Sequence, residues 1–203
     1  DIKYNFSKGN NMIIKLIYVN VGLFIAINLV KVILFLIYGP GNVEIPFSNF
    51  LSYLSVPASL DILLVRPWTL VTSMFTHEGI FHILFNMLIL YWYGSILREF
   101  LGNKKILPIY IYGGLFGAVL YIAVFNLAPG FQSFAGSSIA YGASAAVLAI
   151  VIAAATRAPD YIVRMLLIGP VKIKYIAIFI VVLDILQLPK SNYGGHIAHL
   201  GGA

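Results

Sequence analysis

Cysteine is absent from this chain of 203 residues. Its absence excludes a disulfide framework, a thiol nucleophile and a cysteine-ligated metal site. Charge is also scarce, because only 10% of the residues are charged whereas 61% are hydrophobic, and the mean hydropathy is +0.94. A soluble domain typically carries about 25% charged residues. The composition therefore excludes a soluble domain and predicts an integral helical protein that crosses the lipid bilayer several times.

Acidic residues are the scarcer of the two signs, with 7 Asp and Glu against 13 Lys and Arg. A basic excess can indicate nucleic-acid binding. Here the basic residues are scattered between apolar runs, so membrane topology explains them better and no nucleic-acid partner is expected. No cleavable signal is recognisable, and because the chain begins at Asp1 and stops in an apolar run, both ends are expected to be cut boundaries.

Apolar segments divide the chain into six expected membrane spans within a single domain over residues 1–203. The spans are 16–38, 80–97, 106–127, 141–156, 175–188 and a truncated 193–203. The predicted fold is an all-α membrane protein, a bundle of six transmembrane helices. Between the first two spans, residues 43–80 are apolar but interrupted by prolines, which predicts short helices lying in the membrane interface.

The fourth span is expected to be short and recessed. From Ser144 to the first charge at Arg157 it provides about 20 Å of helix, whereas the hydrocarbon layer is roughly 30 Å thick. With its charged end at one surface, its first turn begins about 10 Å below the other surface. The preceding loop, 128–140, contains no charged residue, so we expect it to dip into the protein to meet Ser144.

The basic residues also orient the chain, because cytoplasmic loops are enriched in lysine and arginine. Ten fall on the side of the N-terminus: Lys3, Lys8, Lys15, Arg98, Lys104, Lys105, Arg157, Arg164, Lys172 and Lys174. Three fall on or near the other side: Lys31, Arg66 and Lys190. The N-terminus is therefore expected in the cytoplasm, and Ser144 is expected to enter the membrane from outside.

All four histidines are expected at that same outer side, His77 and His82 at the second span and His196 and His199 at the sixth. Helix rise places His199 about 9 Å deep, close to the depth of Ser144. A serine among small residues is commonly a packing residue, and so is a lone histidine in an apolar helix. Their convergence favours chemistry instead, because an imidazole that takes the hydroxyl proton makes serine a nucleophile.

Several neighbouring groups suit this chemistry. Small residues permit close contact between the fourth and sixth spans: Gly142, Ala145, Ala149, Gly194, Ala198 and Gly202. The backbone N–H groups of Ala143 and Ser144, at a helix start, are expected to bind an oxyanion. His82 and Asn86 are spaced i and i+4 and are expected to add side-chain donors.

A Ser–His dyad is expected rather than a triad, because no carboxylate has an obvious claim to orient His199. Asp184, near the outer end of its span, is the only candidate third member, and an interfacial polar contact is its alternative role. His196 is expected nearer the water than His199, so His199 is the expected base.

Three motifs together resemble the rhomboid intramembrane serine proteases. They are Gly142-Ala143-Ser144, then His77 with His82-xxx-Asn86, and Gly194-xxx-Ala198-His199 followed by Gly202. The resemblance implies a serine endopeptidase that cleaves transmembrane segments near the outer face without a metal or cofactor. It implies Ser144 as nucleophile and His199 as general base, with His82 and Asn86 at the oxyanion. Gly142, Gly202 and His77 are the expected supporting residues.

The resemblance also implies that the interfacial segment is the family's first loop and that the fifth span is a lateral gate for a substrate helix. Single-span membrane proteins are the expected substrates, and a bacterial inner membrane is the expected location. Three positions depart from the family pattern: Ala145 where Gly is common, Leu148 where a tyrosine stacks on the base, and Thr69 where arginine follows Trp68. The last puts the anchoring of the first loop in doubt.

Other classes of function remain as alternatives. A zinc-dependent membrane protease would use clustered histidines, but the segment from His77 to His82 is one residue too long for an HExxH motif. A catalytically weak or inactive rhomboid-like scaffold would bind membrane proteins without cleaving them. A small transporter would need paired broken helices or charges inside the membrane, and these are scarce.

Overall fold

The protein is seen here as a computed structural model that describes residues 11–165, 168–190 and 192–203. Lys3, Lys8 and Ser191 lie outside the described residues. Three described helices are long and apolar enough to cross a membrane: α2 (Met12–Tyr38), α6 (Ile80–Leu101), and α7 (Ile106–Leu127) with the short turn η2 (Asn103–Lys105) before it. The third helix covers the predicted third span residue for residue, whereas α2 and α6 extend beyond the predicted ends.

The last three predicted spans correspond to shorter helices, α8 (Ser144–Arg157), α9 (Ile173–Gln187) and α10 (Tyr193–Gly202). The count of six spans therefore stays a prediction, although the sequence placed the six segments correctly as helices. The short fourth helix has 14 residues, about 21 Å at 1.5 Å per residue.

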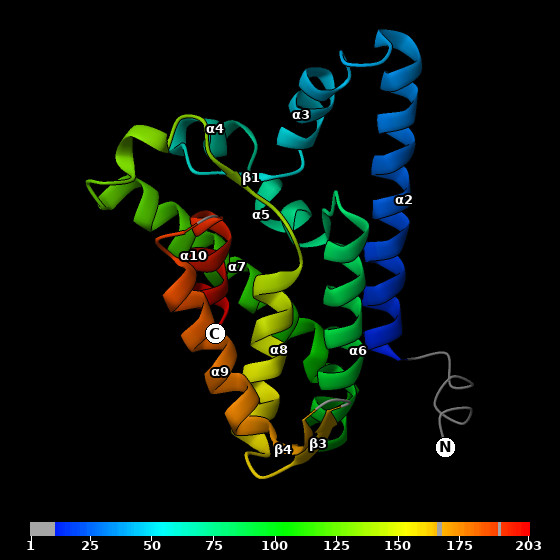
Figure 1. Ribbon diagram of the computed structural model, residues 1–203, viewed down its shortest axis with the longest axis vertical. Coiled ribbons are helices and arrows are strands. Elements are labelled where there is room, and N and C mark those ends of the chain that lie inside the picture. Colours follow the sequence, from blue (N-terminus) through cyan, green and yellow to red (C-terminus); the bar gives the residue numbers. More distant parts are fainter. Residues whose placement is uncertain (1–10, 166–167, 191) are drawn as a thin grey trace.

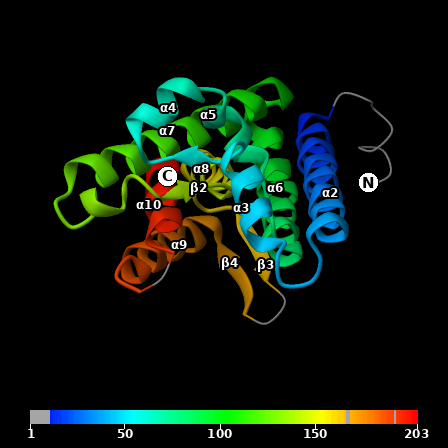
Figure 2. The same cartoon turned by 90° about the horizontal axis from the view of Figure 1, so that it is seen from above.

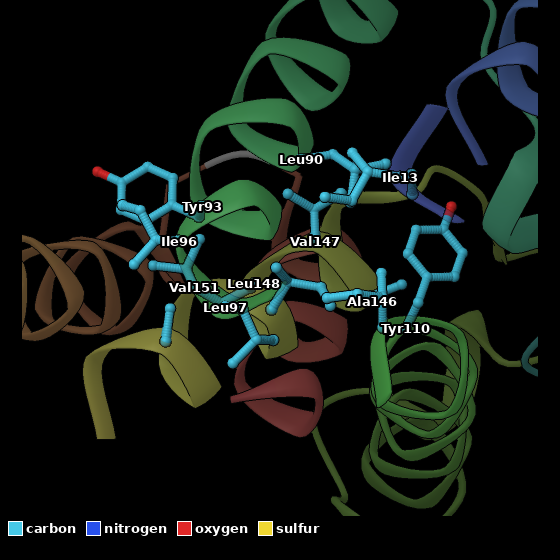
Figure 3. Packing of buried hydrophobic residues seen from close by; sticks show 14 of the residues in the cluster. Ile13, Leu90, Tyr93, Ile96, Leu97, Tyr110, Ala146, Val147, Leu148 and Val151 are labelled. Carbon is cyan, nitrogen blue, oxygen red and sulfur yellow. The ribbon is translucent and has the colours of Figure 1, made fainter. Parts of the chain in front are cut away.

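Helix α8 occupies the centre of the bundle, with α6, α7, α9 and α10 around it (Figures 1 and 2). Its sequence explains this position, because alanines and β-branched residues make it apolar on every side. Val147, Leu148 and Val151 are at most 5% exposed and pack in the same cluster as Leu90 and Leu97 of α6 (Figure 3). Leu148, which replaces the family's common tyrosine, is thus a core residue.

The start of α8 is held by a short strand that precedes it. Strand β2 (Ile139–Ala140) pairs antiparallel with β1 (Val56–Pro57), and the Gly142 N–H donates to the Ser73 carbonyl over 2.8 Å. The end of the uncharged loop therefore reaches into the protein, as predicted. Its middle does not, because Phe134 is 47% exposed in the turn η3 (Gln132–Phe134).

The segment predicted to be interfacial consists of short helices: α3 (Glu44–Ser52), α4 (Leu60–Val65), α5 (Thr69–Thr72) and the turn η1 (Ser73–Phe75). Their position in the membrane interface stays a prediction. The anchoring of the segment comes from Trp68, whose indole N–H donates to the Tyr53 carbonyl over 2.9 Å. The Arg66 guanidinium lies 3.7 Å from the centre of the Tyr53 ring. These contacts anchor the loop without an arginine at position 69.

A small hairpin closes the opposite end of the bundle. Strands β3 (Ile162–Met165) and β4 (Gly169–Lys172) pair antiparallel in the segment between the fourth and fifth predicted spans. With β1 and β2, the hairpin makes the fold mostly rather than entirely α-helical. Beside it, hydrogen bonds from Lys174 and Lys172 lower the pKa of the exposed Asp160 carboxyl to about 2.

Candidate active site

Ser144 is the first residue of α8, and the backbone before it turns sharply. Gly142 has a φ of 126°, a conformation that residues with a side chain rarely adopt. A Cβ atom at this position would lie 2.8 Å from Cε1 and 2.9 Å from Nε2 of His82. Glycine is therefore needed both for the turn and for the close approach of His82. The helix begins at Ser144, as predicted, three residues inside the span placed at 141–156.

His77 stabilises this turn through a hydrogen bond. It is fully buried, and its Nε2 accepts a hydrogen bond from the Ala143 N–H over 3.3 Å. Burial, with a smaller effect of the neighbouring His82, lowers the pKa of His77 to about 4, so the ring is neutral, and because Nε2 accepts the Ala143 N–H its proton is on Nδ1. The Ala143 N–H, expected at the oxyanion, is thus already used inside the protein. The Ser144 N–H has no intrahelical partner, as at any helix start.

One cavity joins the predicted reactive groups. It has a volume of about 910 Å³ and is lined by residues of α6, α8 and α10 that include His82, Asn86, Ser144 and His199. The buried Asn86 amide donates one hydrogen bond to the His82 carbonyl over 2.9 Å. Because an amide nitrogen carries two protons, this group retains one further donor. The structure therefore brings these four predicted residues to one place.

Asp184 of α9 contacts both histidines of α10. Its Oδ1 lies 2.9 Å from Nδ1 of His199 and 2.7 Å from Nδ1 of His196. The sequence favoured a Ser–His dyad and left Asp184 as the only candidate third member. In the structure α9 packs against α10 and Asp184 does reach His199. An ionised carboxylate only accepts hydrogen bonds, so both Nδ1 atoms carry a proton and the Nε2 lone pairs remain available.

His196 and His199 differ in what they face. The His199 side chain is 24% exposed and lines the cavity, whereas the His196 side chain is 13% exposed and is not part of the cavity wall. His199 is therefore the one that shares the cavity with Ser144, and the expected position of His196 nearer the water stays a prediction. Among the described residues no hydrogen bond joins Ser144 to His199, and such bonds often shorten only when substrate binds.

Gly202 supports the site through packing. A Cβ atom at this position would collide with the Ala145 carbonyl oxygen of α8, so only glycine lets α10 approach α8 this closely. Gly202 lies one turn beyond His199, and this contact sets the distance between the histidine helix and the serine helix.

A polar cluster that the sequence did not predict lies next to the residues that precede Ser144. The Tyr141 hydroxyl donates to Oε2 of Glu78 over 3.0 Å, and Lys31 Nζ of α2 lies 3.3 Å from Oε1 of the same carboxylate. The cluster ties α2 to the residues before Ser144, and no sequence signal marks it because its members are far apart in the chain. With both oxygens engaged, Glu78 does not take the role that a zinc-protease glutamate would require.

A second cavity, of about 1390 Å³, lies between α6, α9 and the β3–β4 hairpin. Its walls include Trp92 of α6 and Phe179 of α9, and Ile89 lines both this cavity and the one at Ser144. An apolar opening between two helices thus adjoins the reactive residues.

These features define a helical membrane protein in which a serine at a helix start, a carboxylate-held histidine and a side-chain amide line one cavity. The Rhomboid domain model matches residues 65–203, more than half of the chain. This chain belongs to the rhomboid family.

Two curated relatives are similar to it. "RHOMBOID-like protein 12, mitochondrial" of Arabidopsis thaliana is 34% identical over 148 residues, 68% of this chain and 44% of that protein. "Presenilin-associated rhomboid-like protein A, mitochondrial" of Danio rerio is 29% identical over 137 residues, 66% of this chain and 34% of that protein. The chain thus spans less than half the length of these relatives. Both names include the word mitochondrial, whereas a bacterial membrane was expected from the sequence.

Proposed function

We propose that this protein is an intramembrane serine endopeptidase that cleaves transmembrane segments near the outer membrane face. The observation that carries the proposal is the single cavity that holds Ser144 and His199, with Asp184 bonded to the far side of the histidine ring. Nucleophile, base and orienting group are the three parts that serine hydrolysis needs, whatever the fold.

In the proposed reaction, His199 Nε2 removes the Ser144 hydroxyl proton while Oγ attacks the substrate carbonyl carbon. Asp184 accepts a hydrogen bond from the His199 Nδ1–H and stabilises the imidazolium that forms. The imidazolium then protonates the leaving amine, and the acyl-enzyme bond to Ser144 is broken by water activated by the same histidine. The aspartate holds the ring in the tautomer that leaves Nε2 unprotonated.

The tetrahedral oxyanion of this reaction needs preorganised donors. The Ser144 N–H at the helix start and the second amide proton of Asn86 fill this role in the proposal. His82 contributes its ring, which lies against Gly142 and lines the same cavity.

The proposed substrates are single-span membrane proteins. A recessed cavity accepts only backbone that has left its helical hydrogen bonds, so a segment with small or helix-destabilising residues suits it best. The apolar cavity between α6 and α9, adjoining the site at Ile89, is the proposed entry path from the bilayer. By the distribution of lysine and arginine, the N-terminal side faces the cytoplasm of a bacterium or an equivalent compartment such as the mitochondrial matrix.

Labelling with a fluorophosphonate tests the proposal directly. The full-length protein in detergent should form a covalent adduct, and Ser144→Ala should form none at an unchanged melting temperature. The same pair is then compared for cleavage of a single-span model substrate. A protein that binds this substrate but is neither labelled nor cleaves it would support the alternative, an inactive rhomboid-like scaffold, and would overturn the protease proposal.

A further inference from the structure

Asp184, His196 and His199 bring three metal-ligating atoms together at the edge of the cavity. One carboxylate oxygen and one ring nitrogen from each histidine all lie within 4.8 Å of one another. The two Nδ1 atoms both point at the same oxygen, Oδ1 of Asp184. Two ligands of one zinc ion, each about 2.0–2.1 Å from it, lie about 3.3 Å apart. The existing separations of 2.7 and 2.9 Å are therefore close to those of a bound ion.

The charge of Asp184 is incompletely balanced. Its side chain is 7% exposed, and within the described residues its ion-pair partners are His196 and His199 alone. Its second oxygen, Oδ2, is buried without a hydrogen-bond partner in the part of the chain that the structure describes. A buried carboxylate with a free oxygen and no lysine or arginine beside it is costly. A divalent cation would neutralise it and occupy the free oxygen.

We propose that Asp184, His196 and His199 form a binding site for a divalent transition metal of the zinc class, and that the bound ion inhibits the protein. Two imidazole nitrogens and one carboxylate oxygen form a donor set that suits zinc. The ion binds the two Nδ1 atoms in place of the protons that now bridge to Asp184, and each ring, which stays neutral, carries its proton on Nε2 instead after exchange with water in the cavity. It enters from the cavity at Ser144, because His199 forms part of that wall.

Inhibition follows from what the ion does to His199. With a cation on Nδ1, Nε2 of His199 carries the ring proton and has no lone pair to take the Ser144 hydroxyl proton. The ion also separates the ring from the carboxylate that orients it. The inhibitory part of the inference rests on the proposed function, since it assumes that His199 is the base. The binding part does not, because it depends only on three side chains that are present in a protein without the serine.

Zinc binding is measured with the full-length Ser144→Ala protein in detergent, by competition with a chromophoric zinc chelator. One zinc ion per chain is expected. Adding either His196→Ala or Asp184→Asn should weaken the affinity at least about tenfold, the smallest loss expected when a direct ligand is removed, since even outer partners cost 10- to 100-fold. Asp184→Asn keeps the shape of the side chain, so it guards against a loss caused by misfolding.

His82→Gln in the same background is the matched control, because His77 and His82 form the other histidine pair. Its zinc affinity should equal that of Ser144→Ala. The site would be overturned if Ser144→Ala bound no zinc, or if adding His196→Ala or Asp184→Asn left the zinc affinity of Ser144→Ala unchanged. A loss of affinity confined to His82→Gln would also overturn it.

Inhibition is measured as the zinc concentration that halves cleavage by the parent protein, with reversal by a chelator. His196→Ala, compared with its own zinc-free rate, should need at least about ten times more zinc. Equal sensitivity would overturn the inhibitory role. If the parent is not labelled at Ser144, the proposed function fails, while zinc binding by Ser144→Ala still decides the metal site.

Discussion

The two histidine pairs of this protein have similar ring geometry but differ in the hydrogen-bond partners of their ring nitrogens. The rings of His77 and His82 lie 4.9 Å apart at 67°, and those of His196 and His199 lie 5.9 Å apart at 86°. In the first pair, the Nε2 lone pair of His77 accepts the Ala143 N–H. In the second pair, the Nδ1 atoms meet a carboxylate, which leaves Nε2 of His199 available at the cavity.

His77 and His199 thus carry their proton on the same nitrogen, yet only one of them retains a usable lone pair. What differs is the partner: a backbone donor consumes the lone pair, whereas a carboxylate preserves it. The comparison teaches that a histidine is a structural residue or a base according to which of its nitrogens is already bonded.

The largest expected effect is at His199. His199→Ala should reduce cleavage of a model transmembrane substrate by at least about 10⁴-fold, because a serine hydrolase without its base loses nearly all transition-state stabilisation. Substrate cleavage and melting temperature are measured on the same preparation. His196→Ala is the matched variant and should lose less than about tenfold; the reverse pattern would exchange the roles of these two residues.

Asp184→Asn should have the next largest effect. Asparagine keeps the shape of the side chain, but its amide can donate a hydrogen bond where the carboxylate accepted one from the His199 Nδ1–H. It therefore favours the tautomer with the proton on Nε2, which cannot act as the base, and kcat should fall by about 10²- to 10⁴-fold. KM should change little, and the pH profile of kcat should shift because the imidazolium loses its counter-ion. A parental kcat with only a lower melting temperature would make Asp184 a packing residue.

Asn86→Ala should lower kcat less than His199→Ala or Asp184→Asn does. If the amide donates to the oxyanion, kcat falls by no more than about 10²- to 10³-fold while KM is nearly unchanged. A structural contact between membrane helices is worth about 0.6 kcal/mol on average. An unchanged kcat with a depressed melting temperature would therefore assign Asn86 to packing and leave the Ser144 N–H and His82 as donors.

His77→Ala should have the smallest effect on the rate. Its loss leaves the Ala143 N–H buried without an acceptor, at a cost of about 1–3 kcal/mol, so the melting temperature should fall. The kcat of the folded protein should fall less than about tenfold. If kcat fell as much as in His199→Ala at an unchanged melting temperature, His77 would be a catalytic residue. The contrast between the two histidine pairs would then not hold.

Much of the fold follows from local pattern. A hydrophobic run preceded by Lys104 and Lys105 identified the helix at 106–127 correctly, and prolines in an apolar segment predicted the short helices before α6. The short length of α8 was also predictable, because the number of apolar residues before Arg157 sets it. The hairpin at 162–172 was not, because Ile162–Met165 and Gly169–Lys172 have no pattern that separates a strand from a polar loop.

The sequence by itself determined the membrane class through its composition and the family through the resemblance of three motifs. It also predicted that Ser144, His199, His82 and Asn86 gather, because helix rise and the side of entry set the expected depth of each residue. Only the tertiary structure decided which nitrogen of each histidine is engaged, that Asp184 reaches two histidines at once, and that Ala143 gives its N–H to His77. The physical reason is that these contacts depend on the rotation of α9 and α10 about their own axes and on side-chain rotamers. Packing against neighbouring helices sets both.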